Sequence, residues 1–418
     1  MTPKALFALC DELLHEVLRF TQPADAVVSA FFRRERALGL RERATLAETV
    51  YAVVRERLRY QYLAKSGTGS LERRLTLLAW QGSEAYLRAA ATQEELQWLA
   101  TSRLVSLSKQ PDNLRHNLPE WLATQLQAEV GDEFWPLVEG LNRSAGLDLR
   151  VNLIKGKREA VQAALADEGI PTRPTPFSPW GLRTDQKPTL NRTECFTRGE
   201  VEVQDEGSQL LALLTEAKRG EMVVDFCAGA GGKTLALGAM MRNTGRLYAF
   251  DVSAHRLAAL KPRLARSGLS NVYPAGIAHE RDDRIKRLAG KIDRVLVDAP
   301  CSGLGTLRRN PDLKWRQSPK AIEELVVKQA AILDSAARLV KSCGRLVYAT
   351  CSLLRAENED IAAAFAAAHP DFEPLDVAEV LARQQVADAS TLAVDGQLRL
   401  WPQRHGTDGF FAAVWQRR

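Results

Sequence analysis

The chain has 418 residues, of which 45% are hydrophobic and 26% are charged, a composition that is ordinary for globular proteins and argues against disorder. Its length is enough for roughly two or three domains. The formal net charge of +6 and the pI near 9.0 favour a polyanionic partner without establishing one.

No apolar run reaches the roughly 18 residues that a membrane helix needs, and Asp11 and Glu12 interrupt the first apolar stretch before a signal-like core forms. We therefore expect a soluble, cytoplasmic protein. We also expect a monomer. The six cysteines lack both the CxxC spacing of zinc sites and the density of a disulfide scaffold, so we expect no metal. They are Cys10, Cys195, Cys227, Cys301, Cys343 and Cys351.

Helical periodicity dominates residues 1–145, which predicts an all-α domain. Leu46, Val50 and Val54 fall on one stripe of a helix, and arginines fall on the other. Segment 33–59 is rich in arginine, and lysine and arginine recur at 308–316, so each segment is either an RNA-facing patch or an ordinary solvated face. The arginines of the first segment are Arg33, Arg34, Arg36, Arg41, Arg43, Arg55, Arg57 and Arg59.

The pattern changes to short alternating runs with several prolines, and residues 146–205 are predicted to form a small α+β module. Residues 206–418 then carry apolar runs separated by helical segments, which is typical of a doubly wound parallel sheet of the α/β class. These runs lie at 222–226, 246–251, 294–299 and 345–350, and the segment 409–416 adds a last strand.

The first apolar run leads directly into "DFCAGAGGKT" at 225–234, where small residues let the backbone turn tightly beside a ligand at the next helix N-terminus. A nicotinamide fingerprint would need glycine at Thr234, and a Walker A loop would need one at Cys227. Asp251 ends the second strand, where a carboxylate can hold a ribose diol. A nucleoside without pyrophosphate fits this pattern, and S-adenosylmethionine is the common one; the alternative is a loop that only packs strand on helix.

Cys301 and Cys351 follow two consecutive predicted strands, so both thiols are expected at the crevice where open α/β sheets bind ligands. A thiolate beside a methyl donor suits methylation of pyrimidine carbon 5, because addition of sulfur to carbon 6 turns the ring into a nucleophilic enamine. Asp298 ends the same strand as Cys301, and there it is able to hydrogen-bond the ring N3 and exocyclic amine of cytosine. The reaction must end with loss of the carbon-5 proton and expulsion of the thiolate, and a second cysteine can assist that step.

Five ordered segments resemble the Sun/Fmu-type, RsmB-like RNA cytosine-C5 methyltransferases: "VQDEGSQL", "DFCAGAGGKT", "VLVDAPCSGLGTLRRNPDLKW", "YATCSLLRAENED" and "GTDGFFAAVW". The resemblance covers about 145–418 strongly. Residues 1–145 more loosely resemble the NusB-like RNA-binding domain of the bacterial rRNA enzymes. The implied architecture is a Rossmann-like methyltransferase domain preceded by the small module and the helical domain.

By motif match, the resemblance makes Cys351 the nucleophile and Cys301 the residue that assists product release, an order that the residues alone left open. It places Lys233 and Asp298 near the target base and S-adenosylmethionine on the glycine loop and the adjoining acids. The expected cofactor-binding residues are Cys227, Ala228, Gly229, Ala230, Gly231, Gly232, Lys233, Asp251, Arg256 and Asp298.

The chain departs from the family in one place: Ile277 falls where an acid near the adenine amine is usual. Asp282, Asp283 or a backbone group is expected to replace it. A target base must be flipped or single-stranded, so we also consider an RNA clamp after Cys301, against the alternative that Trp315 is a core residue. Its candidate residues are Arg308, Arg309, Lys314 and Trp315.

These observations predict an S-adenosylmethionine-dependent RNA cytosine-C5 methyltransferase, with 16S rRNA as the expected substrate because of the helical domain. A tRNA methyltransferase of the same chemistry is the nearest alternative. A non-catalytic RNA-binding assembly factor is a second, motivated by Ile277. A DNA methyltransferase is a third, and it would use Cys301 rather than Cys351 as nucleophile.

Overall fold

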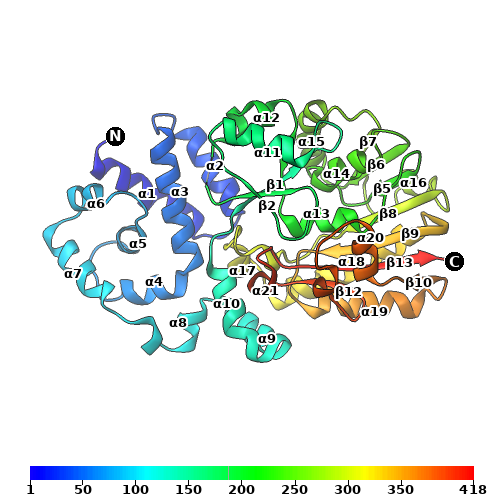
Figure 1. The fold of residues 1–418 in the computed structure, drawn as a ribbon. Coiled ribbons are helices and arrows are strands. Elements are labelled where there is room, and N and C mark those ends of the chain that lie inside the picture. The colour runs from blue at the N-terminus through cyan, green and yellow to red at the C-terminus, as the bar shows by residue number, and fades with distance from the viewer. Residues whose placement is uncertain (187) are drawn as a thin grey trace. The chain divides into compact units, whose positions relative to one another are not determined.

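The computed structural model describes residues 1–186 and 188–418 (Figure 1). The chain forms two compact units. The first unit comprises Met1–Arg143 and Thr306–Pro319, and the second comprises Ser144–Gly305 and Lys320–Arg418. In the part of the chain that the structure describes, no helix combines the length and the apolarity needed to cross a bilayer.

The first unit is built from helices, whose inward faces bury one core. Helix α3 buries Leu46, Val50 and Val54 on one stripe, as the apolar periodicity predicts. Its helices are α1 (Pro3–Val17), α2 (Ala24–Arg34), α3 (Leu40–Arg55), α4 (Arg57–Ala64), α5 (Leu71–Ala79), α6 (Glu84–Ala90), α7 (Gln93–Arg103), α8 (Asp112–His116), α9 (Glu120–Val130), α10 (Phe134–Asn142) and α17 (Leu313–Arg316), with 3-10 turns at Leu107–Lys109 and Gly131–Glu133.

Helix α17 belongs to the segment Thr306–Pro319, which packs within the first unit although 162 residues separate Arg143 from Thr306 in sequence. Lys314 is only 2% exposed, and its Nζ donates to the carbonyl of Arg55 at 2.7 Å. The indole Nε1 of Trp315 donates to the carbonyl of Val54 at 2.8 Å. The predicted RNA clamp is therefore wrong for Lys314 and Trp315, because their polar atoms are bonded inside the unit and the indole packs against its core.

The second unit begins with a small four-stranded antiparallel sheet in the order β2-β3-β1-β4. Its strands are β1 (Leu147–Val151), β2 (Arg173–Pro174), β3 (Gly181–Thr184) and β4 (Val201–Val203), accompanied by α11 (Arg158–Asp167), α12 (Glu194–Thr197) and a 3-10 turn at Leu190–Arg192. The module buries Leu149, Val161 and Leu182 in a core of its own. Its mixed composition agrees with the predicted α+β module.

A nine-stranded sheet forms the rest of the second unit, in the order β11-β12-β13-β9-β8-β5-β6-β7 with β10 paired to β13. Its strands are β5 (Met222–Asp225), β6 (Arg246–Asp251), β7 (Val272–Gly276), β8 (Ile292–Asp298), β9 (Val340–Thr350), β10 (Phe372–Pro374), β11 (Ala393–Val394), β12 (Gln397–Leu400) and β13 (Phe410–Arg417). Strands β5 to β9 pair in parallel, whereas β13 runs antiparallel to β9. The doubly wound α/β prediction is confirmed, with an antiparallel addition at one side.

Helices cover both faces of this sheet (Figure 1). Alternate residues of each central strand enter opposite cores: Val223 and Leu296 face one core, whereas Val224 and Val295 face the other. The helices are α13 (Glu206–Leu213), α14 (Gly232–Met240), α15 (Ala254–Ser267), α16 (Asp283–Lys286), α18 (Pro319–Ala337), α19 (Glu359–Ala368), α20 (Val377–Arg383) and α21 (Pro402–His405), with 3-10 turns at Leu304–Thr306, Arg355–Glu357 and Ala389–Leu392.

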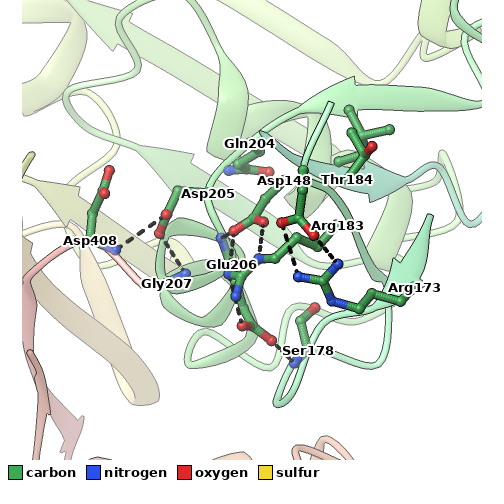
Figure 2. Close-up of polar contacts among 12 residues, drawn as sticks. Asp148, Arg173, Ser178, Arg183, Thr184, Gln204, Asp205, Glu206, Gly207 and Asp408 are labelled. Carbon is green, nitrogen blue, oxygen red and sulfur yellow. Dashed lines mark hydrogen bonds and ion pairs between the residues drawn. The ribbon is translucent and has the colours of Figure 1, made fainter. Parts of the chain in front are cut away.

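A buried polar network joins the small module to α13 through the "VQDEGSQL" motif (Figure 2). Glu206 is fully buried, and its Oε1 accepts from the backbone N–H groups of Phe177 and Ser178 at 2.6 and 2.7 Å. Asp148 of β1 accepts from the guanidinium of Arg183 at 2.6 and 2.9 Å and from the backbone N–H of Glu206 at 3.1 Å. These buried charges are paired, so the network fixes how the module meets the large sheet.

Candidate functional site

A cavity of about 580 Å³ lies at the carboxyl ends of the parallel strands. The chain passes from β5 to β6 and β7 on one side of β5 and then crosses to β8 on the other side. The strand order therefore reverses between β5 and β8, and open α/β sheets bind ligands at such a point. The cavity is lined by Phe226, Cys227, Asp251, Val252, Ser253, Arg256, Ile277, Ala278, His279, Glu280, Asp298, Ala299, Pro300, Cys301, Lys328, Ile332 and Cys351. Both predicted thiols and three of the predicted polar residues therefore share one cavity.

The glycine loop between β5 and α14 runs beside this cavity. Gly231 precedes α14 with φ +82°, and a Cβ there would collide with the side chain of Leu260. Gly229 has φ +55°, and its N–H donates to Asp251 Oδ2 at 2.8 Å. The loop conformation thus needs glycine at these positions, as its sequence predicts.

Asp251 ends β6 with a carboxylate that is 5% exposed. Its Oδ1 accepts from the backbone N–H of Ser253 at 2.7 Å, while Oδ2 accepts from Gly229 and lies 3.8 Å from the guanidinium of Arg256. Arg256 is 62% exposed and is one of the residues that line the cavity. The carboxylate is therefore held rigidly at the cavity wall with its charge partly balanced.

Lys233 and Asp298 form an ion pair between the glycine loop and the end of β8. The distance from Nζ to Oδ2 is 2.7 Å, and the lysine side chain is 11% exposed. Burial opposes the charged amine, but the charge of Asp298 and its hydrogen bond outweigh burial and raise the pKa of Lys233. A cation thus stays beside the cysteine pair.

The sequence predicts that the two cysteines share a crevice, and in the structure their sulfur atoms are in contact. Cys301 Sγ and Cys351 Sγ are 3.4 Å apart, and both side chains are half-buried at the cavity wall. Gly305 fixes this approach, since its N–H donates to the carbonyl of Cys351 at 2.8 Å and its carbonyl accepts from the N–H of Gly409 at 2.8 Å. The hydrogen bond with Cys351 and burial raise the pKa of the Cys301 thiol well above its usual range.

The remaining residues of the predicted cofactor set divide into two groups. Cys227 lines the cavity and is half-buried, and burial raises the pKa of its thiol, which suits a wall residue rather than a nucleophile. The others form the loop backbone and are not among the residues that line the cavity; they are Ala228, Gly229, Ala230, Gly231 and Gly232.

The region after β7 differs from the expectation. Asp282 caps α16, accepting from the N–H groups of Ala278 and Arg284 at 3.0 and 2.9 Å, and Asp283 pairs with Lys286. Neither carboxylate lines the cavity, so the expectation that one of them replaces the acid at Ile277 is wrong.

Glu280 does line the cavity, beside Ile277 itself. Sequence reasoning missed Glu280 because it does not stand at the position of the usual acid. It also missed Glu357, a buried acid that accepts hydrogen bonds from Ser302 and Ser352, the residues that follow the two cysteines.

Sequence comparison places the chain among known methyltransferases. The family described as 16S rRNA methyltransferase RsmB/F matches residues 212–416, and the RsmF/B-like ferredoxin-like domain matches residues 118–190. The chain is 35% identical over 301 residues to "Probable ribosomal RNA small subunit methyltransferase B" of Bacillus subtilis, covering 70% of this chain and 65% of that protein. It is 31% identical over 308 residues to ribosomal RNA small subunit methyltransferase B of Yersinia pseudotuberculosis, covering 73% and 68%.

The chain thus spans about two thirds of the length of the curated relatives that it matches. Among solved structures, the crystal structure of PH0851 is similar with a TM-score of 0.82 and 26% identity, covering 100% of this chain and 99% of that chain. A methyltransferase homolog protein from Pyrococcus horikoshii has a TM-score of 0.63 and 27% identity, covering 75% of this chain and 100% of that chain.

Proposed function

The chain belongs to the RsmB/F family of 16S rRNA methyltransferases, and on this premise we propose that it transfers a methyl group from S-adenosylmethionine to carbon 5 of a cytosine in 16S rRNA. The observation that carries the proposal is the pair of thiols 3.4 Å apart at the wall of the cavity that also contains Asp251 and Asp298. A thiol pair at this place suits a reaction that must both form and break a sulfur–carbon bond.

The cavity fits S-adenosylmethionine, which supplies an electrophilic methyl group when bound. A volume of about 580 Å³ accommodates a nucleoside with an amino-acid tail. Asp251 presents a carboxylate suited to the ribose hydroxyls, and Val252 and Ile332 supply apolar walls for a base. The glycine loop runs beside the cavity, and its glycines leave room for the side chains of Arg256 and Leu260.

Glu280 is the proposed acceptor for the adenine amine in place of the missing acid. Glu280 is half-buried at the cavity wall, and the described residues include no hydrogen-bond or ion-pair partner for its carboxylate. The neighbouring Ile277 closes the wall with an apolar side chain that is 6% exposed. A carboxylate beside an apolar slot binds an exocyclic amine well.

Cys351 is proposed to add its thiolate to carbon 6 of the cytosine. The cation of Lys233 lies near enough to Cys351 for the two groups to interact electrostatically. Asp298, held by Lys233, is then placed to hydrogen-bond the edge of the ring as charge builds up on it. Addition makes carbon 5 nucleophilic toward the methyl group.

Cys301 is proposed to assist the final step, in which the carbon-5 proton passes to a base or to solvent, its bonding electrons re-form the double bond between carbons 5 and 6, and Cys351 Sγ leaves carbon 6 as a thiolate. Its sulfur lies 3.4 Å from the sulfur that leaves. The two roles are thus divided between neighbouring thiols, as the family resemblance implies.

Residues 1–145, the boundary drawn from the sequence, are proposed to bind the RNA as a NusB-like domain. Arg33, Arg36 and Arg41 are exposed there. Arg34 instead pairs with Glu12 and Glu16 at 2.7 and 2.8 Å, so the arginine-rich segment offers fewer phosphate contacts than its sequence indicates.

A methyl-transfer assay tests the proposal. Labelled S-adenosylmethionine is incubated with the protein and with 16S rRNA, with 30S subunits or with bulk tRNA, and the product nucleoside is identified after digestion. The proposal predicts 5-methylcytidine in 16S rRNA, free or in the subunit. Label in tRNA alone would favour the tRNA enzyme, and binding of RNA without any transfer or cofactor binding would favour an assembly factor.

A further inference from the structure

The residues that follow the two cysteines meet at one buried acid. Ser302 comes directly after Cys301, and Ser352 directly after Cys351. Both hydroxyls donate to Oε2 of Glu357, the Ser302 contact measuring 2.6 Å, and the two hydroxyl oxygens lie 3.1 Å apart. The loops that carry the thiols therefore share an anchor.

Two further donors complete the environment of Glu357. Its Oε1 accepts from the backbone N–H of Ser302 at 2.8 Å and from Nε2 of Gln329 at 3.0 Å. The same amide group of Gln329 donates to the carbonyl of Pro300 at 3.0 Å. Four donors thus surround a carboxylate that is fully buried, and a carboxylate is the side chain that accepts all four.

We propose, on the basis of the proposed function, that Glu357 is a positioning residue that holds the two cysteine loops in register and whose charge disfavours the thiolate of Cys301. It acts through Ser302, Ser352 and its charge rather than by touching substrate. A buried acid costs folding free energy unless its oxygens are bonded, and the oxygens of Glu357 are bonded to both cysteine loops.

The charged groups near the two sulfurs differ in sign. The hydrogen bond with Cys351, burial and the charges of Cys351 and Glu357 raise the pKa of Cys301. On the other side, the cation of Lys233 interacts with Cys351. The negative charge of Glu357 therefore acts against ionisation of Cys301.

Residue-resolved alkylation tests this without RNA or cofactor. The wild-type protein and Glu357→Gln are treated with iodoacetamide across a range of pH, and the rates at Cys301 and Cys351 are measured by peptide mass spectrometry. Wild type is expected to react faster at Cys351. Glu357→Gln removes the charge and can no longer accept from all four donors, so the rate at Cys301 is expected to rise about tenfold relative to that at Cys351.

Glu216→Gln is the matched control. Glu216 is also a poorly exposed acid of the second unit, pairing with Arg345 and Arg383. Its loss is expected to lower stability without changing the ratio of the two alkylation rates. Glu357→Asp retains the charge with a shorter reach, and is expected to restore the wild-type ratio while kcat for methyl transfer falls and the KM for RNA is unchanged.

If Glu357→Gln lowers the melting temperature but leaves the alkylation ratio at the wild-type value, the residue is only structural and the inference is overturned. If that variant does not fold, the pH profile of wild type decides: Cys301 reacting at the same or a lower pH than Cys351 overturns it. A protein that shows the predicted ratios but methylates no RNA would contradict the proposed function and leave this inference standing.

Discussion

Asp225 shows how one buried carboxyl group links the site to stability. It ends β5, accepts from the hydroxyl of Thr234 at 2.6 Å, and its Oδ1 has no hydrogen-bond partner among the described residues. Burial raises its pKa from 3.8 to about 7. The folded protein therefore keeps this proton over a pH range in which the unfolded chain has lost it.

The sign of the pH effect follows directly. Between pH 4 and pH 7 the folded state binds more protons at Asp225 than the unfolded state does, so this group lowers stability as pH rises through that window. Asp225→Asn is expected to be more stable than wild type at pH 8 by about 1–3 kcal/mol, and to lose that advantage at pH 4. Urea unfolding at both pH values measures this, with exposed Asp167→Asn as the control; an equal effect at both pH values would contradict it.

At the scale of elements, the loops after β8 and β9 were predictable and their anchor was not. Each cysteine follows an apolar run, and adjacent parallel strands bring their carboxyl ends together, so the sequence indicates that Cys301 and Cys351 share a crevice. Glu357 lies in the polar run "RAENED", which resembles a solvated helix start. Its burial depends on donors from three other segments, and a local pattern carries no information about them.

The burial of the segment Thr306–Pro319 was likewise not predictable from its local sequence. Its polar sequence "TLRRNPDLKWRQSP" suits an exposed loop, and only the acceptors that the helices supply make Lys314 a buried residue. Burial lowers the pKa of that lysine to about 7, an effect that depends wholly on tertiary packing. Glu280 was not predicted because the neighbouring acids Asp282 and Asp283 are equally good replacements for the acid missing at Ile277 when only the sequence is considered.

Gly305 gives a prediction at this scale, because it joins the loop after Cys301 to the loop after Cys351. A Cβ there would meet backbone oxygens of Cys351 and Gly409, which cannot move aside as a side chain can. Gly305→Ala is expected to cost about 1–3 kcal/mol of stability and to separate the two sulfurs, which slows diamide-induced formation of a Cys301–Cys351 disulfide.

Thermal unfolding and the rate of disulfide formation measure these two effects. Gly146→Ala is the control, since a Cβ at that position would have its nearest contact at an ordinary 3.5 Å. A Gly305→Ala protein with wild-type stability and wild-type crosslinking would show that the glycine does not hold the loops together.

In the molecule as a whole, the excess of basic residues is small and does not lie in residues 1–143. Residues 1–143 hold 18 lysines and arginines against 18 aspartates and glutamates, so the net charge of +6 arises elsewhere in the chain. Arg57 is half-buried and packs over Phe20 and Trp315. Binding of RNA by such a protein must depend on placement of a few exposed arginines more than on overall charge.

The central claim is that Cys351 attacks the cytosine and Cys301 assists release, and a gel for covalent protein–RNA adducts tests it most directly. Wild type, Cys301→Ala and Cys351→Ala are each incubated with 16S rRNA and S-adenosylmethionine and separated under denaturing conditions. The account predicts a stable adduct only with Cys301→Ala, and no adduct and no methyl transfer with Cys351→Ala. An adduct that persists in Cys351→Ala and disappears in Cys301→Ala would contradict it by reversing the two roles.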